Sequence, residues 1–437
     1  MKRWLGSVVA TVVVLAWGGL GAAQIKMEIV GPGSTLSPIA VAGLKNLGGD
    51  DEQRLSARFV DTLRRDLELS GYFRVIDPRA YIEDPQTSGY DIGQFNFADW
   101  RAINADFVVK GAVSRKDGQA VVVAMLFDVA QQRRMMGKRL EGAPYEVRRM
   151  ARRFADAVLA ATTGVRGPFD TRLAFVSPDG ARFKEIFTAP LDGYGLSRLT
   201  NNRTINLFPS FDRTGRRLVY LSYKSGHPAL YLADLETQRE REIPSRLGMT
   251  VGGVLTPDGR AVVASISRDG ATNLYLLDFG GEVIRELTHN AAINVGPAVS
   301  ADGKLVAFTS DRSGTPQIYL ESLAGGRAQR LTYRGDYNTT PSFSPSADRV
   351  AYQSRVGGRF DIFAVSTQGG EPVRLTDGVG SNQWPAWSPD GRYLVFSSNR
   401  GGRPRLYLLL VSTHKVVSAL MEERGDETSP AWSWWLR

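Results

Sequence analysis

A short proline-containing motif recurs about every 44 residues along the C-terminal part of the chain. Its clearest copy reads Pro385-Ala386-Trp387-Ser388-Pro389-Asp390-Gly391, and related stretches begin at Pro341, Pro297, Gly253 and Pro209. Each repeat continues with three more short apolar segments, which are separated by turns rich in Gly, Pro, Asn or Asp. A period of this length with four strands per unit is the signature of a β-propeller blade, so the motif predicts a propeller.

The number of repeats predicts how the ring closes. The second-strand pattern occurs in six copies, which begin at Leu173, Leu218, Val262, Leu305, Val350 and Leu394. No inner strand precedes the first copy, whereas residues 429–433 repeat the first-strand motif near the C-terminus. We therefore predict an all-β six-bladed propeller in which this C-terminal strand completes the first blade, because closure removes two open sheet edges. An open array and a seventh blade are the alternatives.

Residues 1–23 have the composition of a secretory signal peptide. Lys2 and Arg3 precede the uncharged apolar residues 5–20, and Gly21-Ala22-Ala23 supplies small side chains for cleavage. We predict cleavage after Ala23, with an uncleaved membrane anchor as the alternative because the apolar run approaches spanning length. No later run is as long and apolar, so we expect a soluble mature protein.

Residues 24–165 do not repeat and are predicted to form a separate α/β domain. Strands are expected at residues 26–30, 39–42, 72–76, 105–113, 120–128 and 131–140. A helix is expected after Asp50 and Asp51, whose carboxylates can cap its first N–H groups, and it ends at Gly71. Its buried stripe is expected to consist of Leu55, Phe59, Leu63 and Leu67.

A second long helix is predicted from Pro144 to residue 163, with Met150, Phe154 and Val158 facing inward. Its arginines are expected to form a solvated face: Arg148, Arg149, Arg152 and Arg153. Residues 164–168 form a short linker, which favours a fixed arrangement of the two domains. The propeller is therefore placed at residues 166–437.

Composition and motifs argue against several classes of function. The chain has no cysteine, which excludes cysteine catalysis and thiolate metal sites, and its net charge of +9 is spread over scattered side chains. No basic-aromatic stripe indicates nucleic-acid binding. A propeller-capped hydrolase would need a G-x-S-x-G nucleophile elbow, and the sequence has none. We expect neither an enzyme nor a cofactor, although a sugar- or lactone-binding propeller remains an alternative.

Histidine and aspartate patterns do not indicate a metal site. The three histidines, His227, His289 and His414, fall in different repeats without ligand-like spacing. The turn aspartates are expected to cap turns: Asp258, Asp302 and Asp390. Trp384, Trp387 and Trp432 are expected in the blade core, whereas Trp434 and Trp435 follow the closing strand and can be exposed.

Several longer motifs resemble the TolB family of periplasmic proteins. They are Leu47-Gly48-Gly49-Asp50-Asp51, Leu69-Ser70-Gly71-Tyr72-Phe73, Phe97-Ala98-Asp99-Trp100-Arg101-Ala102-Ile103-Asn104-Ala105-Asp106 and Gly167-Pro168-Phe169-Asp170-Thr171-Arg172. The order of signal peptide, α/β domain and six blades also agrees with this family. The resemblance implies a monomeric, non-catalytic scaffold of the Tol-Pal system. Such a scaffold lies in the periplasm and reaches the membranes only through a Pal-like lipoprotein and a TolA-like inner-membrane protein. It supports outer-membrane integrity and constriction during cell division.

The same resemblance places the two partner sites. A Pal-like lipoprotein would dock at one mouth of the propeller channel, where the loops before the inner strands contribute Asn206, Met249, Asn294, Asn338, Asn382 and Glu427. Asparagine in such turns also bonds the local backbone, so a purely structural role is the alternative. A TolA-like protein would contact the mature N-terminal tail through Gln24, Ile25, Lys26, Met27 and Glu28, unless that tail is simply a disordered terminus.

The third blade departs from the family pattern. Gly253 replaces the inner-strand proline, and the preceding loop reads Met249-Thr250-Val251-Gly252, where the family often has a histidine. The Pal-type contacts that the resemblance implies for the other blades are therefore not expected in the same form at this blade.

Overall fold

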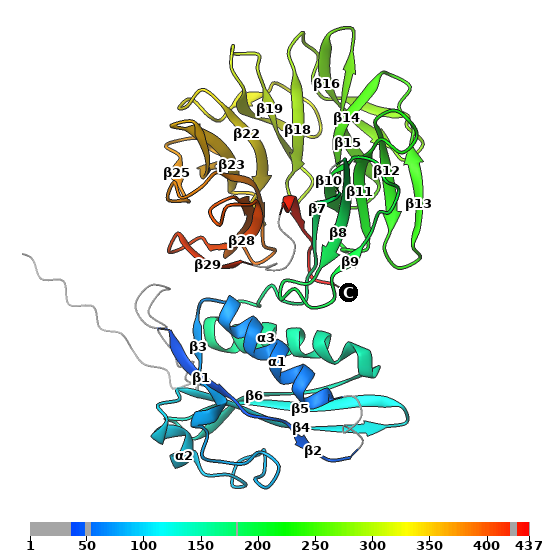
Figure 1. Cartoon of the computed structure of the whole chain (residues 1–437). Helices are drawn as coiled ribbons and strands as arrows, with labels where there is room; N and C mark the ends of the chain where they lie inside the picture. Colours follow the sequence, from blue (N-terminus) through cyan, green and yellow to red (C-terminus); the bar gives the residue numbers. More distant parts are fainter. Residues whose placement is uncertain (1–35, 49–53, 181, 420–425, 437) are drawn as a thin grey trace, which may run out of the picture.

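The computed structural model describes residues 36–48, 54–180, 182–419 and 426–436, which form an α/β domain followed by a six-bladed β-propeller (Figure 1). The predicted fold class is therefore confirmed. Several predicted features lie outside the described residues: the signal peptide 1–23, the strand 26–30, the tail residues Gln24, Ile25, Lys26, Met27 and Glu28, and the capping residues Asp50 and Asp51. Within the described part, no helix combines the length and apolar character needed to cross a membrane.

The N-terminal domain is built on a mixed sheet. Its strands are β1 (Ser37–Val41), β2 (Lys45–Asn46), β3 (Phe73–Val75), β4 (Phe107–Lys116), β5 (Gln119–Asp128) and β6 (Arg133–Gly142). Their order is β3-β1-β4-β5-β6, with β2 also paired to β4. Strand β1 runs parallel to β3 and β4, whereas β4, β5 and β6 form an antiparallel meander.

Two long helices cover one face of this sheet. They are α1 (Leu55–Leu69) and α3 (Val147–Thr163), and α3 follows the short 3-10 helix η2 (Pro144–Glu146). The predicted stripes of both helices are buried, and Gly71 lies just after α1 with a positive φ of 68°. The short helices η1 (Pro78–Ala80) and α2 (Phe97–Ala102) lie with the loop at the opposite face, where Trp100 and Phe127 belong to a second core.

Each propeller blade is a four-stranded antiparallel sheet. Blade 1 contains β30 (Thr428–Trp432), β7 (Leu173–Asp179), β8 (Phe183–Ala189) and β9 (Ser197–Arg198); blade 2 contains β10 (Asn206–Phe211), β11 (Arg217–Ser222), β12 (Ala229–Asp234) and β13 (Arg239–Ile243). Blade 3 contains β14 (Met249–Leu255), β15 (Ala261–Arg268), β16 (Ala271–Asp278) and β17 (Val283–Glu286); blade 4 contains β18 (Asn294–Val299), β19 (Leu305–Ser310), β20 (Gln317–Ser322) and β21 (Gln329–Arg330). Blade 5 contains β22 (Asn338–Phe343), β23 (Arg349–Val356), β24 (Arg359–Ser366) and β25 (Val373–Arg374); blade 6 contains β26 (Asn382–Trp387), β27 (Tyr393–Ser398), β28 (Arg405–Leu410) and β29 (Lys415–Ala419).

The C-terminal strand closes the ring as predicted. Strand β30 pairs antiparallel with β7, and Trp432 lies opposite Leu173. The Trp432 indole is buried and its Nε1 donates a hydrogen bond to Thr171 Oγ1 at 2.9 Å. The last described strand therefore completes the sheet that begins the propeller, and this contact ties the two ends of the repeat array together.

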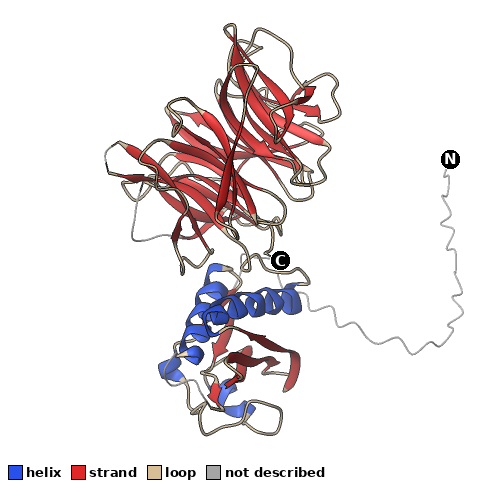
Figure 2. Ribbon diagram, turned by 90° about the vertical axis from the view of Figure 1, so that its right-hand side faces the viewer, coloured by secondary structure: helices blue, strands red, loops and turns tan. Residues whose placement is uncertain are grey.

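The propeller ring has two structurally different ends. Because neighbouring strands of a blade are antiparallel, the inner strands begin and the second strands finish at the same end, which we call the open end. The turns after the first and third strands lie at the opposite, domain-facing end. There the Tyr393 hydroxyl donates to Ser70 O at 2.7 Å, and the Arg392 guanidinium donates to Thr163 Oγ1 at 2.9 Å. Figure 2 shows the helices lying between the N-terminal sheet and the propeller.

The arginine-rich face of α3 is covered by the propeller. Arg152 is buried, and its guanidinium donates two hydrogen bonds to the Asp192 carboxylate at 2.8 and 2.9 Å. Arg149 pairs with Asp170 at 3.0 Å. Both carboxylates belong to the chain that leads into or through blade 1, so these pairs join the two domains.

The prediction of a solvated arginine face is therefore wrong for most of these side chains. The Arg148 guanidinium lies 4.0 Å from the centre of the Tyr194 ring, a cation–π contact with the same blade 1 loop. Among the four arginines, only Arg153 is exposed. The helical period alone could not reveal this packing, because a charged face looks the same whether water or a second domain covers it.

Candidate partner-binding surface

The asparagines predicted at the channel mouth lie inside the ring. The side chains at these repeat positions have no exposed surface: Asn206, Asn294, Asn338, Asn382 and Glu427. Asn294 illustrates the contacts, because its Nδ2 donates to Asn273 Oδ1 at 3.1 Å and to Thr272 O at 2.9 Å in the preceding blade. The side chain thus crosses from the first strand of one blade to the third strand of its neighbour.

A threonine at the outer edge of each of four blades completes this polar contact. Thr288 Oγ1 donates to Asn273 Oδ1 at 2.9 Å, so one third-strand side chain holds both the outer strand and the next blade. Equivalent sets are Thr200, Glu185 and Asn206; Thr332, Gln317 and Asn338; and Thr376, Asp361 and Asn382. These asparagines therefore hold adjacent blades together. The expectation that they face a partner is corrected, because each points into a sheet interface.

The third blade also places its residues differently. Thr250, not Met249, takes the position two residues before the inner-strand bulge and is buried. Met249 is the one predicted mouth residue that faces outward, with 53% of its surface exposed. A Cβ added at Gly253 would lie 2.8 Å from Leu230 Cδ1 of blade 2 and 3.0 Å from Val263 O, so a larger residue here would require its neighbours to shift.

A backbone bulge interrupts the inner strand of every blade at the same place. The bulge residues have positive φ angles: Phe208, Gly252, Gly296, Thr340, Trp384 and Ser429. Five of them precede a proline, and the strand register shifts at each bulge. A left-handed conformation is costly for a β-branched residue such as Thr340, with φ 53°. Strain of this kind often accompanies functional sites.

These bulges surround a cavity of about 290 Å³ at the open mouth of the channel. Its lining is mainly apolar and includes Phe208, Trp384 and the inner-strand prolines. Large apolar side chains are exposed around it, on the loops and strand ends of the open end: Ile205, Phe208, Tyr223, Met249, Ile293, Tyr333, Val356 and Val379. We call these eight residues the apolar rim. A concentration of exposed apolar groups at one end is typical of a protein-binding surface.

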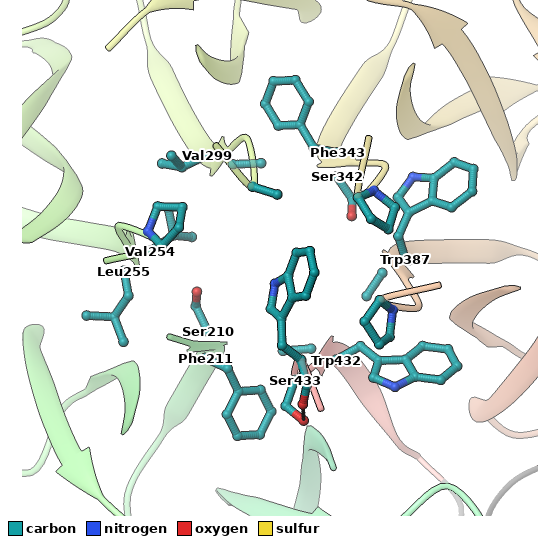
Figure 3. Close-up of a pocket in the computed structure, with 18 of the residues that line it drawn as sticks. Ser210, Phe211, Val254, Leu255, Val299, Ser342, Phe343, Trp387, Trp432 and Ser433 are labelled. Carbon is teal, nitrogen blue, oxygen red and sulfur yellow. Dashed lines mark hydrogen bonds between the residues drawn. The ribbon is translucent and has the colours of Figure 1, made fainter. Parts of the chain in front are cut away.

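The domain-facing mouth of the channel is organised differently. Figure 3 shows Ser210 and Ser342 turned toward the central space, whereas Phe211, Phe343 and Trp387 point away from it between the blades. The cavity there has a volume of about 270 Å³ and is also lined by Trp434. The Arg213 guanidinium lies 4.5 Å from the centre of the Trp434 ring. This mouth is therefore partly occupied by the chain's own C-terminal segment.

Comparison with known protein families agrees with this architecture. The TolB beta propeller domain family matches residues 160–436, and the TolB amino-terminal domain family matches residues 25–135. The chain belongs to the TolB family.

Individual relatives agree with the family assignment. The Tol-Pal system protein TolB of Desulfosudis oleivorans is 37% identical over 232 residues, which cover 53% of this chain and 52% of that protein. The Tol-Pal system protein TolB of Syntrophotalea carbinolica is 35% identical over 219 residues, covering 50% of each. The chain thus spans about half the length of the curated relatives it matches. The crystal structure of TolB from Acinetobacter baumannii superposes with a TM-score of 0.79 at 25% identity and covers 92% of this chain and 97% of that one.

The turn aspartates and the histidines have ordinary structural environments in this TolB-family fold. Ser300 Oγ donates to Asp302 Oδ1 at 2.6 Å, and the equivalent bonds reach Asp258 and Asp390. His227, His289 and His414 are all exposed. Among the described residues, no three acidic or histidine side chains gather in a way that would hold a metal ion.

The tryptophans divide between the two ends. Trp387 and Trp432 are buried as predicted, whereas Trp384 lines the open mouth. Trp434 and Trp435 are half-buried. Trp435 Nε1 donates a hydrogen bond to the linker carbonyl of Gly167 at 2.7 Å. Sequence reasoning missed the interblade threonines, although the Leu-Thr pairs ending at Thr200, Thr288, Thr332 and Thr376 follow the blade period.

Proposed function

We propose that this chain is a periplasmic scaffold of the Tol-Pal system that joins a Pal-like outer-membrane lipoprotein to a TolA-like inner-membrane protein. Through these partners it would support outer-membrane integrity and constriction during division, without catalysing a reaction. Support comes from TolB-family membership and from relatives described as Tol-Pal system proteins. The signal-like residues 1–23 support export to the periplasm.

The apolar rim carries the lipoprotein part of the proposal. Eight large apolar side chains are exposed at the open end. Fewer are exposed toward the domain-facing end of the propeller, where the described ones are Tyr194 and Leu196 on a loop and Val283, Ile284 and Val373 on outer strands. A monomeric protein gains no stability from leaving such groups in water, so their concentration favours a partner that covers them. The buried asparagines behind the rim keep neighbouring blades in register and so keep the surface preformed.

The ordered structure of the apolar rim also favours tight binding at the open end. The rim is displayed on short loops and strand ends between paired strands, and a proline, whose φ is restricted, follows the inner-strand bulge in five of the six blades. A surface that is already ordered loses less conformational entropy when its partner binds. Large apolar and aromatic side chains near the centre of an interface usually contribute most of the binding energy. We therefore assign the lipoprotein contact to the rim and the 290 Å³ mouth cavity.

A binding titration tests the assignment. The double variant Ile293→Asp and Tyr333→Asp introduces charges at two exposed rim positions on different loops. We expect at least a tenfold weaker Kd for the Pal-like lipoprotein of the same organism, measured by isothermal titration calorimetry. Val373→Asp is the matched control, because Val373 is as exposed as Ile293 but lies on an outer edge strand. Equal loss in both variants, or none in the double variant, contradicts the assignment.

The TolA-like contact is proposed for the mature N-terminal tail, Gln24, Ile25, Lys26, Met27 and Glu28. Deleting these five residues from the exported protein should abolish capture of the TolA-like partner while leaving lipoprotein binding intact. A chain that keeps these five residues at its N-terminus in scrambled order is the control, because it preserves the length and composition of the tail. Retained capture by the deletion variant would remove the tail from the proposal.

A further inference from the structure

The junction between the domains contains a third arginine close to Arg149 and Arg152. Arg149 is paired with Asp170 and Arg152 with Asp192, as described above. Arg172, at the start of the propeller, has no carboxylate partner among the described residues. It is partly buried, and burial together with the neighbouring Arg149 and Arg152 charges lowers its pKa. A cation in such a place lacks the counter-charge that its neighbours have.

Arg172 lines a large crevice. This crevice between blades 1 and 2 has a volume of about 580 Å³, within the size range of small-molecule and peptide sites. A second arginine on its wall, Arg239, likewise has no carboxylate partner among the described residues, whereas Arg198 is paired with Asp179 at 2.7 Å. The crevice wall thus includes two arginines that have no carboxylate partner among the described residues.

The remaining wall selects the kind of anion. Two carboxylates lie there, and both are already engaged: Asp234 pairs with Arg216 at 3.0 Å, and Glu240 bonds to Lys224 and the Tyr220 hydroxyl. Their negative charge disfavours a phosphate dianion more than a singly charged carboxylate. Other wall groups, such as the side chains of Thr188 and Asn201, can bond to peptide amides.

We propose that this crevice binds the terminal carboxylate of a short peptide segment, with Arg172 as the bidentate partner and Arg239 as a second cation. A planar guanidinium matches a carboxylate with two parallel hydrogen bonds. The site is separate from the apolar rim, since it lies between the blades and next to the domain junction. It is independent of the proposed lipoprotein contact, and the two are tested with different variants.

The test uses the exported chain and two probes, the tripeptide N-acetyl-Ser-Ala-Ala with a free carboxylate and the same tripeptide as its C-terminal amide. Arginine Nε–H signals are followed by NMR during titration. We expect the acid to bind with a Kd in the millimolar range or below and to shift a signal that is missing in Arg172→Gln. The amide and Arg172→Gln should each weaken binding at least tenfold. The matched control Arg153→Gln, an exposed arginine of α3, should bind normally.

A second variant tests the crevice without removing the charge. Ser197→Trp, on the exposed strand β9 at the crevice wall, should block the acid peptide by filling the space while the thermal midpoint stays unchanged. Equal binding of acid and amide, unchanged binding by Arg172→Gln, or no binding by the native chain overturns the proposal. Displacement of the peptide by an equal concentration of inorganic phosphate overturns the carboxylate assignment. Lipoprotein capture should be normal in both variants, which separates this site from the proposed function.

Discussion

The two ends of the propeller are made from the same repeat but treat their side chains in opposite ways. The open end leaves large apolar groups such as Tyr333 and Met249 in water and keeps its asparagines buried. The domain-facing end buries the ion pair between Asp192 and Arg152 of α3, and covers its channel mouth with Trp434. Polar groups therefore stabilise the ring where they are hidden, and apolar groups are available for binding where they are exposed.

This difference separates stability from recognition along the sequence. Residues in the first and third strands of adjacent blades contribute to stability, because an unpaired polar group buried there costs free energy. Residues on the open loops contribute little to stability, because they contact mainly water. Exposed recognition residues and buried stabilising residues can be neighbours in one repeat, as the exposed Met249 and the buried Thr250 illustrate. Variants that exchange the two classes therefore test the comparison directly.

The largest effect is expected from charging the buried asparagines. Asn294→Lys together with Asn338→Lys would place two cations where no surface is exposed and would remove one hydrogen-bond partner each from Asn273 and Gln317. We expect a loss of about 5 kcal/mol or more in the free energy of unfolding, enough to prevent normal folding. Circular dichroism melting measures it.

Met249→Lys is the control for this prediction, because it adds the same charge one position before the buried site in a neighbouring blade. Its effect on stability should stay within about 0.5 kcal/mol. If the double asparagine variant melts at the native temperature, the interblade contacts do not stabilise the ring. The comparison between hidden and exposed positions would then fail.

The fold was largely predictable because its signals are periodic. The 44-residue motif, six second-strand copies and the extra segment containing Trp432 gave the blade number and the closing strand, and the stripe through Phe59 gave α1. Such patterns repeat one packing requirement many times. The prediction of the ring therefore did not depend on any single residue.

The candidate surface was less predictable, because exposure depends on contacts between distant segments. Asn294 looks like a loop residue in the sequence, but its amide reaches a strand 21 positions earlier and is sealed by the adjacent blade. Arg152 resembles a solvated helical residue until Asp192 covers it from another domain. The rim residues Ile293 and Tyr333 carry no motif at all. Only the closed ring shows that they share one end.

The next largest effect is expected at the domain-facing end. Arg152→Ala leaves the fully buried Asp192 side chain without its counter-charge, which should cost about 3–5 kcal/mol. Thermal melting with limited proteolysis measures the loss, and we expect cleavage near residues 164–168 to accelerate as the junction loosens. Arg152→Ala with Asp192→Ala should be more stable than the single variant. A single variant as stable as the native chain contradicts the inference that this pair holds the domains together.

A pH-dependent effect of intermediate size is expected from Asp66 on α1. Both of its carboxylate oxygens are buried without a hydrogen-bond partner among the described residues. Burial raises the pKa of Asp66 well above its usual range, and the nearby Asp192 and Asp156 charges add to this, whereas Arg152 and Arg65 oppose it. The folded chain therefore retains a proton that the unfolded chain releases above about pH 4, so stability should fall as pH rises from there.

Asp66→Asn removes this titration while keeping the size of the side chain. Between pH 5 and pH 8 the variant should lose less stability than the native chain. Thermal melting measures the difference, because each kcal/mol of unfolding free energy shifts the melting midpoint by about 2–4 °C. Some slope should remain, because burial raises the pKa of Asp156 to about 7 and its contribution has the same sign. If stability falls with pH equally in the two proteins, protonation of Asp66 does not contribute to the pH dependence of stability.

The smallest effect, and the one with a reversed sign, is expected at the inner-strand bulges of the open end. Thr340 and Gly296 occupy equivalent places with φ of 53° and 59°. Thr340→Gly should raise stability by up to about 1 kcal/mol, because glycine adopts this conformation without a Cβ penalty, while Gly296→Ala should lower it by a similar amount. A Cβ at Gly296 would lie no closer than 4.0 Å to the nearest atom, so crowding does not explain such a loss.

Chemical denaturation measures the change in the free energy of unfolding for both variants. Opposite signs would mean that the open end stores backbone strain; equal signs would mean that side-chain contacts, not the backbone, decide stability at the bulges.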